Sequence, residues 1–481
     1  MPSCYMSTGS LPSALSSRTG RCAFLTLLLC TPAGAATAQT RDGSGDSYWG
    51  AIPPPADSVS AVFASGPRPV WETVLLVPYW IIGLPLRLVA VGVGEGVELI
   101  DGSGVASTVA GWLGPRTGPF GVIISARAGG LSGVGGGVAV EHTELFNRPG
   151  TAFRGRVAGT FIGDFRASGA VRVPFAERSL LDLGTGYRFR NRVRYFGIGP
   201  ERGEEDESLF RQRTWWVGGE VTGSWGDQIT TSASLVFTSV KPLDAPEADQ
   251  DGDDPPITVR YADSLPPGFG ETSNGLALGA EIMHQDVTDT GRPVGGGIRR
   301  AMVGYFRGTG GETTQFWNVR GELQQFVPLW YRHHVLALRL LASWMQQIGD
   351  APIPFTRLIT NDDPDLLRGF DDFRWRDRGL AVLSAEYRWP LWASERAEGA
   401  GLDLYLLTDV GQVFSDFDDI RGRNLTFSYG AGLRLLTAAG FALRIEYARS
   451  NEDAVFRLRG DQIFQTFRSA LYHGRDPNPA R

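Results

Sequence analysis

Cysteine and lysine are almost absent from this sequence, and each absence excludes a class of chemistry. Three cysteines occur among 481 residues, and all lie in the first 30 positions: Cys4, Cys22 and Cys30. The remaining chain therefore has no disulfide framework and no cysteine nucleophile. Lys241 is the only lysine. It does not follow a glycine, so a phosphate-binding GxxxxGK[ST] loop is excluded.

Common catalytic and nucleic-acid-binding patterns are missing as well. The sequence contains no GxSxG nucleophile motif, no HExxH metal motif and no spaced set of cysteine and histidine ligands. Acidic residues outnumber basic ones by 52 to 46, which gives a net charge of -6 and argues against a nucleic-acid partner. We therefore expect no enzyme, no resident metal or cofactor, and no nucleic-acid binding.

The N-terminus has the layout of an export signal. Two arginines precede the apolar run CAFLTLLLC (22–30), and small residues follow, with Ala36 and Ala38 in an A-x-A arrangement. This pattern predicts a secretory signal peptide over 1–38, cut before Gln39. The alternative, a buried N-terminal helix, would require an amphipathic period that the run does not have.

Apolar and polar residues alternate with a period of two in many segments. In 335–345, five residues share one face (Leu336, Leu338, Leu340, Ala342 and Trp344), and Ala337, Arg339 and Ser343 share the other. The segments 402–411 and 441–447 are split in the same way. A period of two predicts β-strands with one apolar face and one charged face.

Repeated alternation of this kind is typical of a transmembrane β-barrel. The alternative is a water-soluble β-sandwich with one wet face. Two features favour the barrel: the apolar faces are bulky and continuous, and aromatic residues gather at segment ends, as in 214–217, 328–331 and 388–392. We predict an all-β fold, a 16-stranded antiparallel transmembrane β-barrel over 118–467, in the outer membrane of a Gram-negative-type bacterium.

The alternation places the sixteen strands near the following positions: 118–127, 132–143, 151–162, 165–174, 180–193, 207–224, 228–240, 272–286, 294–306, 313–327, 330–346, 379–391, 401–414, 425–436, 440–449 and 455–467. The two longest gaps, 241–271 and 347–378, follow the seventh and eleventh strands. If the first strand runs outward, both gaps are extracellular loops, and the second is the sixth such loop.

Four segments in the last third of the chain resemble one known family. They are LRGF (367–370), AEYRWPL (385–391), LTDVGQVF (407–414) and GAGLRLLTAAGFALRIEYA (430–448). In this order and spacing they resemble the BamA/TamA superfamily of outer-membrane assembly and translocation barrels, also called the bacterial surface antigen family. A lone RGF tripeptide would be weak support, whereas four segments in order are specific.

The resemblance implies a set of site residues. It implies that the sixth extracellular loop folds into the lumen, where Arg368, next to Gly369 and Phe370, pairs with Glu386 and Asp409. Independently of the resemblance, the period of two places Glu386 and Asp409 on the polar faces of their strands. We therefore predict a lumen lock made by these five residues, and we expect the apolar tetrapeptide to be buried.

The chain departs from the family outside the barrel. Members that handle client proteins usually carry polypeptide-transport-associated domains before the barrel, and residues 39–117 do not show their pattern. We expect a flexible linker over 39–70 and short amphipathic helices within 71–117, which lie on the periplasmic leaflet or close the barrel mouth. A spanning helix within 71–100 is the alternative. Residues 468–481 are predicted to be a polar, dispensable tail.

The resemblance implies a function in inserting or translocating proteins, or lipids, at the outer membrane. The expected partners are outer-membrane lipid, lipopolysaccharide, unfolded outer-membrane proteins and accessory periplasmic proteins. The alternative is a passive pore or surface-anchored barrel of the same fold without insertion activity.

Overall fold

A computed structural model describes residues 119–459 and residue 471, except for 128–133, 246–254, 288–291, 330–333, 364, 394–400 and 437–441. The predicted signal peptide, linker and N-terminal amphipathic segment lie outside the described residues. Among the described residues, no helix is long and apolar enough to cross a membrane.

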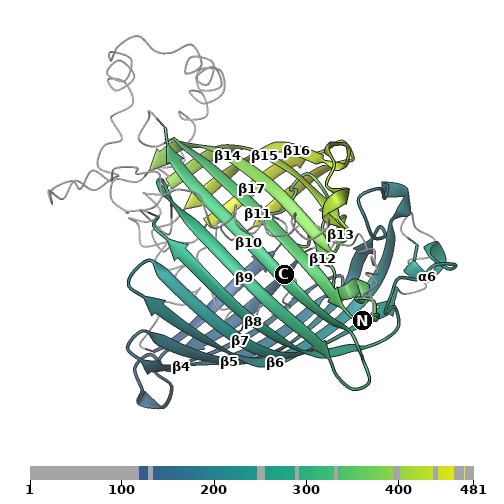
Figure 1. Cartoon of the computed structure of the whole chain (residues 1–481). Coiled ribbons are helices and arrows are strands. Elements are labelled where there is room, and N and C mark those ends of the chain that lie inside the picture. Colours follow the sequence, from purple (N-terminus) through teal and green to yellow (C-terminus); the bar gives the residue numbers. More distant parts are fainter. Residues whose placement is uncertain are drawn as a thin grey trace, which may run out of the picture. The chain divides into compact units, whose positions relative to one another are not determined.

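Sixteen strands form one antiparallel sheet in which each strand pairs with the next along the chain (Figure 1). The strands are β1 (Phe120–Arg127), β2 (Gly135–His142), β3 (Ala152–Thr160), β4 (Phe165–Ala176), β5 (Ser179–Tyr195), β6 (Ser208–Trp225), β7 (Ile229–Asp244), β8 (Ser273–Gln285), β9 (Gly296–Gly308), β10 (Gln315–Pro328), β11 (Val335–Ile348), β14 (Gly379–Ala393), β15 (Gly401–Phe414), β16 (Thr426–Leu436), β17 (Ala442–Arg449) and β18 (Ala454–Arg459).

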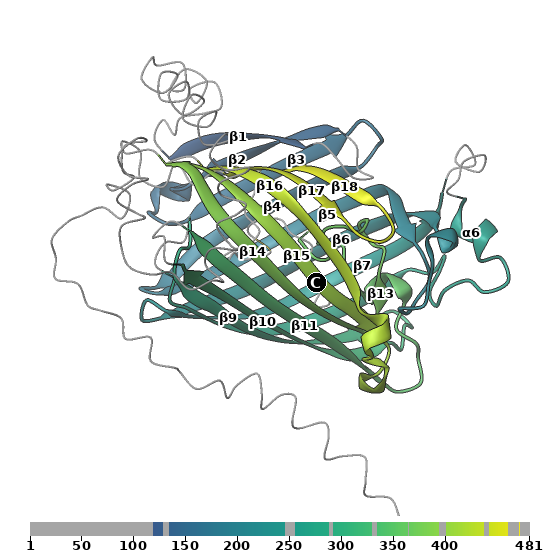
Figure 2. The same cartoon turned by 90° about the horizontal axis from the view of Figure 1, so that it is seen from above.

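Shorter elements lie in the connections. A second sheet consists of β12 (Ile359–Thr360) and β13 (Arg376–Asp377), and α6 (Ile257–Arg260) lies between β7 and β8. Short 3-10 turns occur at Leu145–Asn147, Glu204–Asp206, Phe355–Arg357, Phe417–Asp419 and Gly422–Asn424. In both views, α6 and β13 lie at the same end of the long strands (Figure 1, Figure 2).

The predicted number of strands and their antiparallel order are confirmed, and most boundaries agree within a few residues. The predicted last strand, 455–467, is described only as far as Arg459. The sequence did not predict β12 and β13, because strands of two residues each are too short to show a period.

The predicted closure of the sheet into a barrel is not found among the described strands. There, β1 pairs only with β2 and β18 only with β17, so the sheet ends at two unpaired edges.

The two faces of the sheet differ as the alternation predicted. On β6, Trp216 is fully buried, whereas its neighbours Trp215 and Val217 are 43% and 47% exposed. On β11, Arg339 is buried and Leu340 is exposed. We call the buried, polar face the inner face and the exposed, apolar face the outer face. An apolar outer face suits contact with lipid.

The connection from β11 to β14, residues 349–378, packs against the inner face, and we call it the inner loop. Its residues Leu366, Leu367, Phe370 and Trp375 join a buried cluster with Val413 of β15 and other strand residues. The inner loop also reaches β8, where Arg357 Nη2 donates a 2.8 Å hydrogen bond to the carbonyl oxygen of Ser273. Contacts to both β8 and β15 show that the sheet curls around this loop.

Leu471 is the one described residue of the predicted polar tail, and it is buried. Only 2% of it is exposed, because it packs against Trp216 and Val236 on the inner face of β6 and β7. At this residue the predicted polar tail therefore packs on the sheet. Leu471 is the only leucine, isoleucine, valine or methionine in 468–481, and burying it is favourable.

Candidate functional site

The LRGF tetrapeptide forms the tip of the inner loop and is buried. Leu367 and Phe370 are almost completely excluded from solvent, in a cluster with residues of β14 and β15. Gly369 lies so close to the neighbouring strands that a Cβ there would be 2.5 Å from Cβ of Ser428 and 2.7 Å from the carbonyl carbon of Arg449. The tip therefore requires glycine at 369 and apolar residues on both sides of the arginine.

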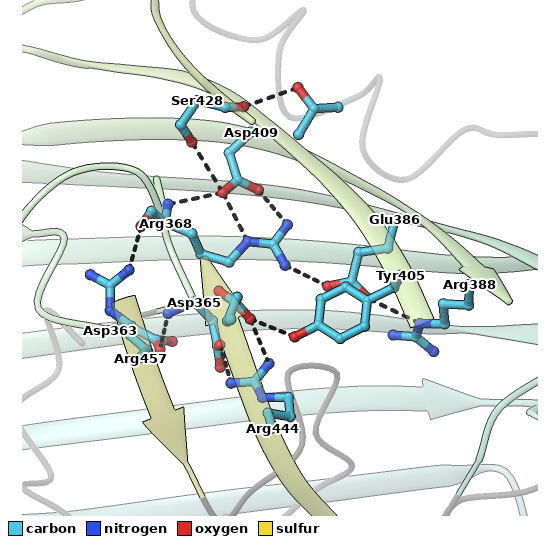
Figure 3. A network of polar contacts seen from close by, with 12 residues as sticks. Asp363, Asp365, Arg368, Glu386, Arg388, Tyr405, Asp409, Ser428, Arg444 and Arg457 are labelled. Carbon is cyan, nitrogen blue, oxygen red and sulfur yellow. Dashed lines mark hydrogen bonds and ion pairs between the residues drawn. The ribbon is translucent and has the colours of Figure 1, made fainter. Parts of the chain in front are cut away.

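Arg368 is fully buried and binds two carboxylates from neighbouring strands (Figure 3). Its Nε and Nη2 donate to the two oxygens of Asp409 on β15, at 2.9 and 2.7 Å. Its Nη1 donates to Glu386 Oε1 on β14 at 2.5 Å, and its backbone N–H also donates to Asp409, at 2.9 Å. The guanidinium thus forms a two-bond fork with one acid and a single bond with the other.

The electrostatics of this site favour a permanent cation. Burial by itself lowers the pKa of Arg368, but the charges of Asp409 and Glu386 raise that pKa well above its ordinary value. The second oxygen of Glu386 accepts a 2.9 Å bond from Arg388 Nε on the same strand. Each carboxylate oxygen of Glu386 and Asp409 therefore has a donor.

The inner loop is also bound to the last two strands. Arg444 of β17 donates to Asp365 at 2.8 Å, and Arg457 of β18 donates to the carbonyl oxygens of Arg368 and, at 3.0 Å, Phe370 (Figure 3). These contacts continue the ones to β14 and β15. The inner loop is thereby fixed to strands that run as far as the β18 edge.

A further bond holds the turn between β17 and β18. Arg374 of the inner loop forms two 2.8 Å bonds with the carboxylate of Glu452. Sequence reasoning missed this contact and those of Arg444 and Arg457. Alternation had placed Arg444 on a charged face, but it gives no information about which loop residue meets that face.

The structure brings together all five residues predicted for the site. Arg368, Glu386 and Asp409 are in direct contact, while Gly369 and Phe370 complete the buried tip. Their role as a lock stays a prediction. In the described part of the chain, no group of three or more His, Cys, Asp or Glu side chains is arranged to hold a metal ion.

Comparison with known proteins finds a family match for part of the chain. Residues 276–464 match the Omp85 superfamily domain. The fold is similar to that of BamA from Haemophilus ducreyi lacking POTRA domains 1–3, with 12% identity and a TM-score of 0.52, over 71% of this chain and 69% of that one. The resemblance expected from the sequence is thus confirmed for an Omp85 superfamily domain and a BamA-like fold.

Two further solved structures are similar over less than two thirds of their own length. CdiB from Acinetobacter baumannii has 14% identity and a TM-score of 0.46, over 70% of this chain and 58% of that one. CdiB from Escherichia coli has 13% identity and a TM-score of 0.47, over 72% and 61%. No curated protein matches this chain.

Proposed function

We propose that this protein is an outer-membrane β-barrel that inserts or translocates proteins, without enzymatic chemistry. The observation that carries the proposal is the contact of Arg368 with Glu386 and Asp409 within an Omp85 superfamily domain. This contact fixes the inner loop beside a sheet whose edge strands, β1 and β18, are unpaired as far as the structure describes them, which is an arrangement suited to receiving another strand.

The outer face supports the proposed membrane location. Along the central strands the exposed side chains are large and apolar: Val217, Leu235, Leu278, Val303 and Leu383. Side chains of this kind stabilise a sheet in lipid and would promote aggregation in water. Outer-membrane lipid and lipopolysaccharide are therefore the proposed surroundings.

The unpaired edges give the proposed activity a physical basis. The outward-directed N–H and C=O groups of β1 and β18 can hydrogen-bond to an extended client strand, as in β-augmentation. Because the inner loop binds β14, β15, β17 and β18, it holds the β18 edge in a fixed position before a client arrives. A preorganised edge lowers the entropic cost of pairing. The proposed partners are unfolded outer-membrane proteins and accessory periplasmic proteins.

The second candidate is a passive pore or surface-anchored barrel, in which the same contact only stabilises the fold. The full pairing of Glu386 and Asp409 is compatible with it, because a satisfied buried network needs no moving part to explain it.

Reconstitution separates the two candidates. The purified protein is placed in liposomes, an unfolded outer-membrane barrel is added, and its folding is followed by heat-modifiable migration on gels. We expect faster client folding than in empty liposomes, and less acceleration by Arg368→Ala than by Arg213→Ala, which changes an exposed side chain on β6. If the folded wild-type protein accelerates no client and brings none along in affinity purification, the second candidate holds.

A further inference from the structure

The inner face of β4 to β7 carries a row of small and apolar residues. The row consists of four residues that are paired in register across four strands: Ala170, Gly184, Gly218 and Val236. Trp216 lies beside it and is fully buried. Arg172 lies two residues after Ala170 on β4, and Asp182 lies two residues before Gly184 on β5. These two side chains form a bidentate ion pair next to the row.

Leu471 rests on this row. It forms a buried cluster with Trp216 and Val236. A Cβ placed on Gly184 would lie 3.4 Å from the Cβ of Leu471 and 3.3 Å from its carbonyl oxygen, so main chain and side chain both lie over the glycine. Glycine inside a strand weakens it and often marks the close approach of another backbone. The backbone that approaches Gly184 is that of Leu471.

The tail sequence agrees with a specific contact. Residues 468–481 contain arginines, prolines and small polar residues, and Leu471 is their only large aliphatic side chain. That one side chain is the one found on the apolar row.

We propose that the row Ala170, Gly184, Gly218 and Val236, with Trp216, is a docking surface for the chain's own C-terminal segment, which binds there through Leu471. The segment is an internal ligand of the inner wall. Any other polypeptide that runs along this wall has to displace Leu471. The docking does not depend on the proposed insertion activity, so either idea can fail without the other.

Disulfide trapping tests the contact in the full chain, with Cys4, Cys22 and Cys30 changed to serine. Gly184→Cys is combined with Leu471→Cys, because Cβ atoms in disulfides lie about 3.8 Å apart. The matched control combines Leu471→Cys with Leu183→Cys, whose side chain is 49% exposed on the outer face. After oxidation we expect the first pair to lose both maleimide-reactive thiols and the control pair to keep them. Equal labelling of the two pairs would overturn the proposal.

A second measurement covers the case in which the double variant does not fold. In a chain with Leu471→Cys as its only thiol, we expect maleimide labelling to be about tenfold slower in the folded than in the denatured protein, because the residue is buried. Adding Trp216→Ala should restore fast labelling, and adding Trp215→Ala on the outer face should not. Fast labelling of the folded single variant, or equal effects of the two tryptophan changes, would show that Leu471 does not dock on this wall.

Discussion

Replacing Arg368 by alanine leaves two buried carboxylates without their shared cation. Asp409 loses two of the three hydrogen bonds that Arg368 donates to it, because the bond from the backbone N–H at 368 remains. Glu386 loses its bond from Arg368 and keeps the one from Arg388. Removing one partner of a buried ion pair costs about 3–5 kcal/mol, because the remaining charge stays desolvated. We expect Arg368→Ala to lower the free energy of unfolding by about that amount.

The same change should release the inner loop. In the wild type, Leu367 and Phe370 hold the tip in a buried cluster, and a protease cannot bind it. Without the Arg368 contacts, the tip gains access to conformations outside the sheet, and added protease should cut between residues 349 and 378. Unfolding midpoints in denaturant and cleavage of folded protein in membranes measure the two effects separately.

Two further variants decide whether the contact is responsible. Arg368→Lys should recover only part of the stability, because an ammonium cannot form a fork with Asp409 and still reach Glu386. Arg368→Ala combined with Asp409→Ala should cost less than the sum of the single changes, since both remove the same bonds. Additive costs, or a silent Arg368→Ala in both assays, would refute the account of a buried lock.

Four other measurements follow from the same structure. Arg457→Ala should speed hydrogen exchange of the β18 amides that bond to β17, while the amides of β14 and β15 stay protected. The control Arg213→Ala, at an exposed side chain on β6, should change exchange in none of these strands. Unchanged exchange in β18 would show that Arg457 does not hold the edge. Gly369→Ala should cost about 1–3 kcal/mol in unfolding experiments, since a Cβ there overlaps β16 and β17. Arg172→Lys, at a side chain that is 25% exposed, should cost less than Arg368→Lys at a fully buried one, because a lysine ammonium at 172 keeps part of its contact with water. Mass spectrometry of the exported protein should show an N-terminus at Gln39, and an intact Met1 would contradict the signal peptide.

The sequence predicts those parts of the fold that depend on local period. Strands such as β6 and β11 bury every second residue, so their positions and faces follow from alternation alone. The meeting of Arg368 with Glu386 and Asp409 was predicted only with the help of the family resemblance, because the residues are 18 and 41 positions apart. Nothing in a period of two selects one inward carboxylate over another.

Contacts between distant segments could not be predicted from the sequence, because a period of two gives the face on which a residue lies but not its partner. Leu471 meets Trp216, and Arg374 meets Glu452, through the curl of the sheet, which depends on the twist accumulated over many strands. The state of the sheet edges is another global property. A prediction of sixteen strands does not determine whether β1 and β18 pair.

The scarcity of lysine has a structural explanation on the inner face. Three buried or half-buried acids each receive two bonds from one guanidinium: Asp182 from Arg172, Asp409 from Arg368, and Glu452 from Arg374. A planar guanidinium satisfies both oxygens of a carboxylate at once and is more weakly hydrated than an ammonium, so it loses less on leaving water. A lysine ammonium in these places could not form the same planar two-bond fork, and little water is available there to replace the lost bond. A sheet that encloses a charged loop therefore favours arginine at inward positions. By contrast, Lys241, the only lysine, is an exposed residue at the end of β7.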